Sequence, residues 1–157
     1  TQVADELRGV YRATRYGGDP QAGRDIFFGH TSAQCARCHS VRGRGGGAVG
    51  PDLTGIGTRR DRSHLVQSLI EPGAEIAPGF GSVTLTLEDG STVSGTYRGE
   101  STDSIRVGAG SAGSRSIARS RIASRRFGHS SMPSMKSVLT REQIRDVVAY
   151  LASLKGT

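Results

Sequence analysis

The spacing of hydrophobic positions changes along the chain, from helical at both ends to alternating in the middle. Apolar residues three and four positions apart predict helices over 20–29, 62–70 and 141–155. A weaker pattern of the same kind predicts a lead-in helix over 2–14. From Val83 onwards, apolar and polar residues alternate with a period of two, which is typical of a half-buried strand.

Local end signals support the predicted helices. Asp19 is suited to cap the first helix, because its carboxylate can accept backbone N–H groups and Pro20 fits the first helical position. Thr140 and Gln143 have the spacing of a capping box at the start of the last helix. The Gly-rich stretch 42–50 has no regular pattern, and we expect a flexible loop there.

The middle of the chain reads as a small β unit of four or five strands over residues 80–126. Asp89-Gly90 is a hairpin signal between its first two strands. The pattern predicts strands over the ranges 83–87, 92–97, 104–107 and 115–118. The predicted organisation is therefore a lead-in segment, 1–18, a helical domain, 19–79 and 127–157, and the inserted β unit, 80–126. The expected fold class is α+β.

Composition points to a thin core and a basic surface. The chain has no Trp, four Phe and 23 Gly among 157 residues, so a bulky apolar cofactor would help to fill the interior. No apolar run approaches the ~20 residues that a transmembrane helix needs. A net charge of +7, almost all from Arg, favours an acidic partner. We expect no specific nucleic-acid binding, since no motif for it is present. Because the chain begins at Thr1, we expect a processed or excised piece.

The chemistry-bearing motif is Cys35-Ala36-Arg37-Cys38-His39. It has the C-x-x-C-H spacing of covalent haem attachment. Two thiols this far apart can form thioethers with the two vinyl groups of one haem, and the next residue, His39, can ligate the iron. A zinc site would need further ligands at suitable spacing. A thioredoxin-like dithiol would need a βαβ setting, which the pattern does not show.

A second axial ligand has to come from elsewhere in the chain. We favour Met132, because it lies in a Ser-Ser-Met-Pro loop just before the last helix and a thioether is a common partner of His. The alternatives that the sequence leaves open are Met135, His129, His64, His30 and an open site.

With these motifs in order, residues 19–79 and 127–155 resemble a class I cytochrome c. The resemblance implies a cytochrome c-like helical haem fold with the antiparallel β unit inserted. It implies that the Pro51 carbonyl accepts a hydrogen bond from His39, which fixes the imidazole and increases its basicity. It also implies that Leu53 packs on the haem and that Arg59 or Arg60 meets a haem propionate.

Two pairs of residues should mark the crossing of the first and last helices in this family. They are Gly23 and Phe27 on the first helix, and Tyr150 and Leu151 on the last.

From residue 20 on, the chain is similar to a haem-binding domain family found at the ends of large secreted bacterial proteins. The matching stretches are GRDIFF, CARCH, VGPDLTGIG, SLIEPGAEIAPGF, VTLTLEDGSTVSG, SSMP and LTREQIRDVVAYL. The resemblance implies one covalent haem c and a periplasmic or otherwise exported location, because such haem is attached outside the cytoplasm. It further implies a redox partner protein or a fused dehydrogenase-like domain.

The expected function is single-electron transfer through a His/Met-ligated haem, not catalysis. A haem-based gas or redox sensor is one alternative, and it needs an open sixth position on the iron. Another is a binding module in which the β insert contacts a partner. The candidate contact residues of that module are Arg115, Arg119, Arg121, Arg125 and Arg126.

Overall fold

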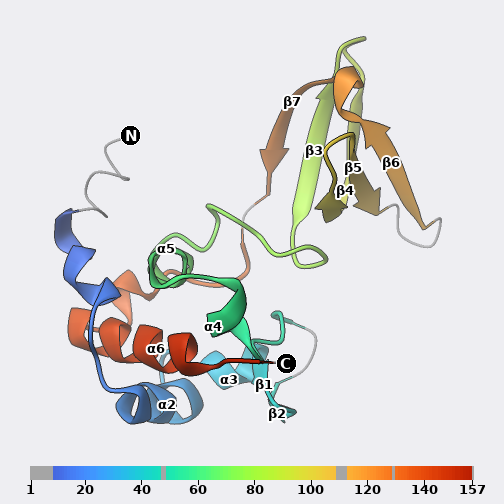
Figure 1. Cartoon of the computed structure of the whole chain (residues 1–157). Helices are drawn as coiled ribbons and strands as arrows, with labels where there is room; N and C mark the ends of the chain where they lie inside the picture. The colour runs from blue at the N-terminus through green and yellow to red at the C-terminus, as the bar shows by residue number, and fades with distance from the viewer. Residues whose placement is uncertain (1–8, 47–48, 109–112, 129, 157) are drawn as a thin grey trace. The chain divides into compact units, whose positions relative to one another are not determined.

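The computed structural model describes residues 9–46, 49–108, 113–128 and 130–156. The chain forms two compact units, drawn in Figure 1: a helical unit, Thr1–Ala74 with Pro133–Thr157, and a β unit, Glu75–Met132. This division assigns 75–79 and 127–132 to the β unit, whereas the sequence pattern grouped them with the helices. Helices and a sheet occur in the same chain, so the predicted α+β class is confirmed.

The helical unit is built mainly from short helices joined by turns and loops. In chain order its helices are η1 (Arg12–Arg15), α2 (Pro20–Gly29), α3 (Cys35–Cys38), α4 (Ile56–Arg59), α5 (Arg62–Ile70), η4 (Met135–Ser137) and α6 (Arg141–Ser153). The hairpin of β1 (Ser40–Val41) and β2 (Arg44–Gly45) follows α3. The predicted lead-in helix falls partly outside the described residues, and Arg12–Arg15 in its described part form a 3₁₀ helix.

Helix ends follow the local signals in the sequence. The Asp19 carboxylate accepts the N–H of Gln21 at 2.9 Å, and α2 spans the predicted residues 20–29. Thr140 and Gln143 form the reciprocal capping box of α6. α5 also has its predicted bounds, with the Asp61 side chain accepting the His64 N–H at 2.8 Å.

Helices α2 and α6 cross at a glycine. Gly23 is buried, and a Cβ at this position would lie 2.8 Å from the Tyr150 Cβ and would collide with the Asp146 carbonyl. The Phe27 ring lies 5.7 Å from the Tyr150 ring between centroids. The Asp146 carboxylate also accepts the Asp19 N–H at 2.8 Å. The predicted crossing of the first and last helices is therefore present, and it closes the helical unit.

The β unit is a five-stranded antiparallel sheet with its own core. Its strands are β3 (Ser82–Leu87), β4 (Thr92–Glu100), β5 (Ser104–Gly108), β6 (Ser114–Ala118) and β7 (Ile122–Phe127), in the order β6-β5-β4-β3-β7. The last strand returns to pair with the first, with Val83 opposite Phe127. The inward positions form a buried apolar cluster: Val83, Leu85, Leu87, Tyr97, Ile105, Val107 and Ile117.

A carboxylate organises one end of this sheet. Glu100 forms ion pairs with Arg119 and, at 2.8 Å, with Arg125, and it accepts the Tyr97 hydroxyl at 2.9 Å. Partial burial opposes ionisation of Glu100. The hydrogen bonds from Arg125 and Tyr97 and the two Arg charges outweigh it, so the pKa of Glu100 is lowered. Burial and the nearby Glu100 raise the pKa of Tyr97. Two of the five candidate contact Arg residues, Arg119 and Arg125, thus pair with a carboxylate of their own unit.

Candidate haem-binding site

The two cysteines lie on one short helical turn. α3 consists of Cys35–Cys38, and the His39 N–H donates to the Cys35 carbonyl at 2.9 Å, which ends the turn. Both thiols are free and half-buried. Burial raises the pKa of the Cys35 thiol, opposed by a backbone hydrogen bond and aided by Cys38. The turn therefore presents two thiols that are close together.

His39 is held by a backbone carbonyl. Its Nδ1 lies 2.9 Å from the Pro51 oxygen. A carbonyl oxygen can only accept, so the proton of a neutral imidazole belongs on Nδ1. The other ring nitrogen, Nε2, then carries a lone pair suited to a metal ion. The contact inferred between His39 and Pro51 from the family resemblance is present.

Most of the described glycines of the stretch after the motif are packed against it. Residues 42–50 were expected to form a flexible loop, but Arg44–Gly45 pair with Ser40–Val41 as β2. A Cβ at Gly46 would collide with the Arg37 carbonyl, and one at Gly50 would lie 2.8 Å from the His39 Cε1. Glycine is required at Gly46 and Gly50 for this close approach. The expectation of a flexible loop is wrong for Arg44–Gly45, because these residues form a strand.

The backbone around the motif, which we call the frame, continues through the segment after Pro51. The Leu53 N–H donates to the Ser40 carbonyl at 2.8 Å, and Leu53 is half-buried. Asp52 accepts the Thr54 N–H at 2.7 Å, and hydrogen bonds from Thr54 lower the pKa of Asp52. Arg59 donates from Nη1 to the Thr54 carbonyl at 2.8 Å. This chain of contacts joins the predicted site residues Leu53 and Arg59 to the backbone that holds the motif.

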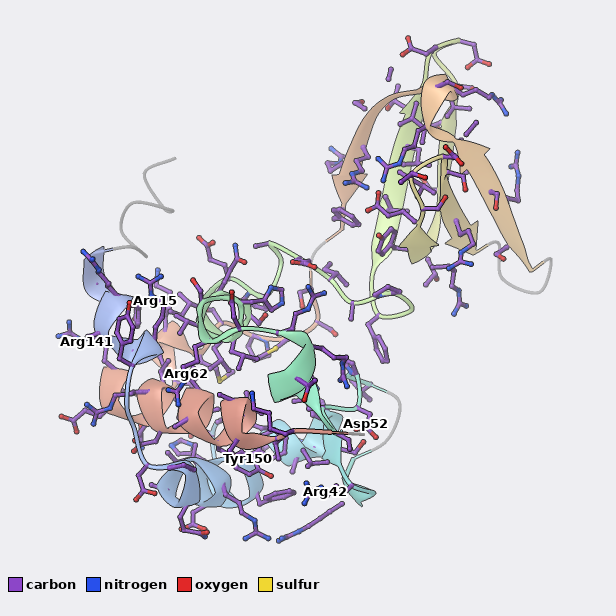
Figure 2. All side chains as sticks on the ribbon, in the orientation of Figure 1. Arg15, Arg42, Asp52, Arg62, Arg141 and Tyr150 are labelled. Atoms are coloured by element: carbon purple, nitrogen blue, oxygen red, sulfur yellow. The ribbon has the colours of Figure 1, made fainter. Side chains whose placement is uncertain are left out.

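Three Arg residues gather around Phe28 and Tyr150. Arg44 stacks over Phe28 at 4.1 Å and Arg24 lies 5.5 Å from the same ring centroid. Burial raises the pKa of Tyr150, and the charges of Arg24, Arg42 and Arg44 oppose that rise, so all three guanidinium groups lie within electrostatic range of this hydroxyl. Figure 2 labels Arg42 and Tyr150 in this part of the helical unit. We call Arg24, Arg42 and Arg44 the basic cluster.

The structure brings together most, but not all, of the predicted site. Cys35, Cys38, His39, Pro51 and Leu53 share one frame in the helical unit. Arg59 is joined to this frame through Thr54, while a contact of Arg59 or Arg60 with a propionate stays a prediction.

The two methionines fall in different units. Met132 is half-buried and is the last residue of the β unit. Met135 is buried in the helical unit, at 2 % exposure. The assignment of Met132, or alternatively Met135, as an iron ligand stays a prediction.

Sequence reasoning missed the residues that close the frame. The N–H groups of Gly46 and Gly50 donate to the Ala36 and Cys38 carbonyls of the motif, and the Ser40 carbonyl next to the motif accepts the Leu53 N–H. The only available signal was the density of glycine directly after C-x-x-C-H, which equally suits a flexible loop. Their role depends on contacts that form only when the chain folds back.

The donor set fits covalent haem. Two thiols separated by two residues, followed by an imidazole with Nδ1 engaged, supply two attachment points and one iron ligand. Over the residues with described positions, no group of three or more His, Cys, Asp and Glu side chains could hold a metal ion. A structural zinc site normally uses four such ligands. The described side chains therefore match haem attachment and do not supply a zinc site.

Comparison with known proteins identifies the same region. Residues 21–90 match the family model described as cytochrome c. The match covers α2, the C-x-x-C-H motif, α5 and β3, and it ends before the Met132 loop and α6.

A relative of known sequence matches as well. A cytochrome c-553-like protein of Synechocystis is 35% identical over 63 residues, which are 40% of this chain and 54% of the relative. The chain thus spans about half the length of this relative. These comparisons support a class I c-type cytochrome domain in the segment around His39, with covalently attached haem c and its iron as the cofactor.

Proposed function

We propose that the chain is a monohaem electron carrier in which His39 and Met132 are the axial iron ligands. The hydrogen bond between His39 and Pro51 carries this proposal, because it fixes the imidazole and directs Nε2 to the metal role. Bound haem supplies the one-electron couple of its iron. The protein holds the ring through Cys35 and Cys38 and fixes the imidazole.

The surroundings of the two methionines support Met132 as the distal ligand. Met135 is 2 % exposed, and its carbonyl accepts the Leu139 N–H at 2.9 Å within the turn of η4. Ser134 anchors this turn by donating to the Ile70 carbonyl at 2.6 Å. Met135 therefore has a packing role in the helical unit. Met132 is half-buried and precedes Pro133, so its side chain is not already committed to that core.

An acidic redox partner is supported by the basic cluster. Arg24, Arg42 and Arg44 come from α2 and from the hairpin that directly follows the Cys-His motif. Positive charge at this place steers a negatively charged protein surface toward the covalent attachment site. The partner is a separate protein or a fused dehydrogenase-like domain.

We also propose an exported location, such as the periplasm. Thioether attachment of haem takes place outside the cytoplasm, and the chain carries one such motif. None of the described helices is both long and apolar enough to cross a membrane.

The test of the proposed ligand pair compares two methionine variants. Met132→Ala should remove the long-wavelength thioether band of the ferric protein, lower the reduction potential and allow CO to bind the ferrous form. Met135→Ala should keep the ferric spectrum and lower stability by about 2–5 kcal/mol, because it opens a cavity in the helical unit. Absorption spectra, a redox titration and thermal unfolding measure the three effects.

The spectra also separate the alternatives. Loss of the thioether band in Met135→Ala alone would assign the ligand to Met135. A parent protein that lacks the band and binds CO readily would instead favour the sensor function.

A further inference from the structure

A hollow on the surface of the helical unit gathers cationic side chains. It has a volume of about 610 Å³ and is lined by Arg59 and Arg60 at the end of α4, Arg62 at the start of α5, and Lys155 after α6. Pockets that bind small molecules typically measure about 300–1,000 Å³. The size of the hollow thus suits a small ligand.

The side chains that α6 contributes to the hollow are small, which leaves space beside the cationic groups. The face of α6 toward the hollow presents Ala149, Ala152 and Ser153, all with small side chains. Figure 2 labels Arg62, which lies next to α6. A ligand can therefore approach the α6 surface with the cationic groups around it.

The charge of the hollow is strongly one-sided. Asp61 is the single carboxylate among its described lining residues, against four cations. The Asp61 Oδ1 already accepts the His64 N–H at 2.8 Å as the cap of α5. The lining residues alone thus carry a net charge of +3, from four positive side chains less one negative, which favours an anion.

Backbone carbonyls hold three of the cations in place. Arg62 donates from Nη1 to the Gly17 carbonyl at 2.8 Å, and Lys155 donates from Nζ to the Gly57 carbonyl at 2.7 Å. Arg59 is fixed in the same way by the Thr54 carbonyl. A guanidinium has five N–H donors and an ammonium has three, so each group keeps donors for a ligand. Fixing these long side chains beforehand reduces the entropy lost on binding.

The hollow contains no residue of the haem attachment motif, although two of its cations, Arg59 and Arg60, are the residues expected to meet a haem propionate. None of the residues from Cys35 to Leu53 is among its lining residues. Its floor is the side of α6 that carries Ala149 and Ala152, and it also touches Pro20 at the start of α2. Arg62 and Lys155 have no part in the proposed haem site, so they can be changed independently of it.

We propose that this hollow binds a small polyvalent oxyanion, either a phosphate compound or a polycarboxylate. Both share oxygen atoms that accept paired hydrogen bonds from guanidinium groups, and both match a cluster of fixed cations. Binding would bridge α4, α5 and the end of α6, and it would stabilise the helical unit because only the folded chain assembles the site.

The experiment uses the haem-loaded protein with pyrophosphate and, separately, citrate as probes. Calorimetric titration gives Kd, and thermal unfolding followed in the haem absorption band gives the shift in Tm. Sodium chloride at matched ionic strength is the reference for screening. We expect saturable binding of one anion per chain and a rise in Tm beyond that reference. A higher affinity for pyrophosphate than for citrate would assign the phosphate class, and the reverse would assign the carboxylate class.

Three single-charge variants test the location of the site. Arg62→Gln and Lys155→Gln should each weaken Kd about tenfold, the loss expected for one hydrogen bond between charged groups. Arg106→Gln, which removes a charge from the β unit, should leave Kd unchanged. Because the anion-induced shift in Tm is measured for each variant against its own anion-free Tm, a loss of basal stability does not mimic a loss of binding. Absence of saturable binding in the parent, or equal weakening by all three substitutions, would overturn the proposal.

Discussion

Gly23 of α2 faces Tyr150 of α6 at a distance that leaves no room for a side chain. A Cβ at position 23 would lie 2.8 Å from the Tyr150 Cβ, closer than carbon atoms normally approach. Gly29, at the end of the same helix, has nothing within 4 Å of its Cβ position. Substitution by alanine at these two sites therefore separates the effect of packing on stability from the effect of helix propensity.

Gly23→Ala should destabilise the helical unit. Overpacking typically costs about 1–3 kcal/mol, and the rigid Asp146 backbone next to Gly23 favours the upper part of this range. Gly29→Ala should be neutral or stabilise by up to about 1 kcal/mol, because alanine is the better helix former. Chemical unfolding of the haem-loaded variants measures both. Equal free energies of unfolding in the two variants would contradict the close crossing.

Removal of the haem should unfold one unit more than the other. With Cys35→Ser and Cys38→Ser together, covalent attachment is lost, and the helical unit loses a large part of its core. The β unit has its own buried cluster, including Leu85, Ile105 and Ile117, and should keep its sheet. Circular dichroism should show a weak helical signal with strand signal retained.

The parent protein, with its haem, is the reference for that measurement. Haem staining after denaturing electrophoresis should label the parent and not the double variant. A cooperative helical transition in the double variant close to that of the parent would show that haem is not needed for folding.

Glu100 should make the β unit sensitive to acid. Its pKa is lowered in the folded chain, so its carboxylate contributes stability at pH values above about 4.3, the unfolded value. That contribution is lost as the pH falls through the lower folded value. Glu100→Gln should lose about 1–2 kcal/mol near pH 7 and show a smaller difference from the parent in acid.

Glu88→Gln is the matched control, because Glu88 is exposed in the same unit. It should change stability little at any pH. Thermal unfolding of the sheet at several pH values measures these differences. If the deficit of Glu100→Gln did not shrink in acid, the ion pairs with Arg119 and Arg125 would not be its cause.

The basic cluster should act on encounter with an acidic partner. Arg42→Gln with Arg44→Gln should lower the bimolecular electron-transfer rate with such a protein at low salt, and the difference should fade as salt screens the charges. Arg115→Gln with Arg121→Gln removes the same charge from the β unit and should have a smaller effect. Stopped-flow rates at several ionic strengths measure this. A rate independent of salt in the parent would favour transfer inside one longer polypeptide.

The sequence predicts elements well where the determining signals are local. Helices α2 and α5 have the predicted bounds, since Asp19 and Asp61 cap their starts with their own side chains. The bounds of α6 differ by two residues, because it ends at Ser153 and Leu154 follows as an extended cap. The turn α4 and strand β7 were not individually predicted. α4 is only four residues long, and β7 carries adjacent Arg residues that hide its alternation.

The candidate site also has a part that local signals predict and a part that depends on contacts between distant segments. C-x-x-C-H is a local motif and identifies the attachment residues directly. The packing of Gly46 and Gly50 on that motif depends on the chain folding back, so composition alone suggested a loop there. The hollow beside α6 draws residues from three separate segments, Pro20, 57–62 and 149–155, and no short pattern predicts such a gathering.

The pairing of Val83 with Phe127 brings the entry and exit of the β unit together. The Gly128 N–H donates to the Ser82 carbonyl at 3.0 Å, so the two connections leave the sheet side by side. If the insert were unfolded, the helical unit could fold only by closing a long loop. Each doubling of loop length costs about 0.6 kcal/mol of chain entropy. Once folded, the insert behaves as a short connection between α5 and η4. An organism could therefore gain or lose this segment with little effect on the folding of the helices around it.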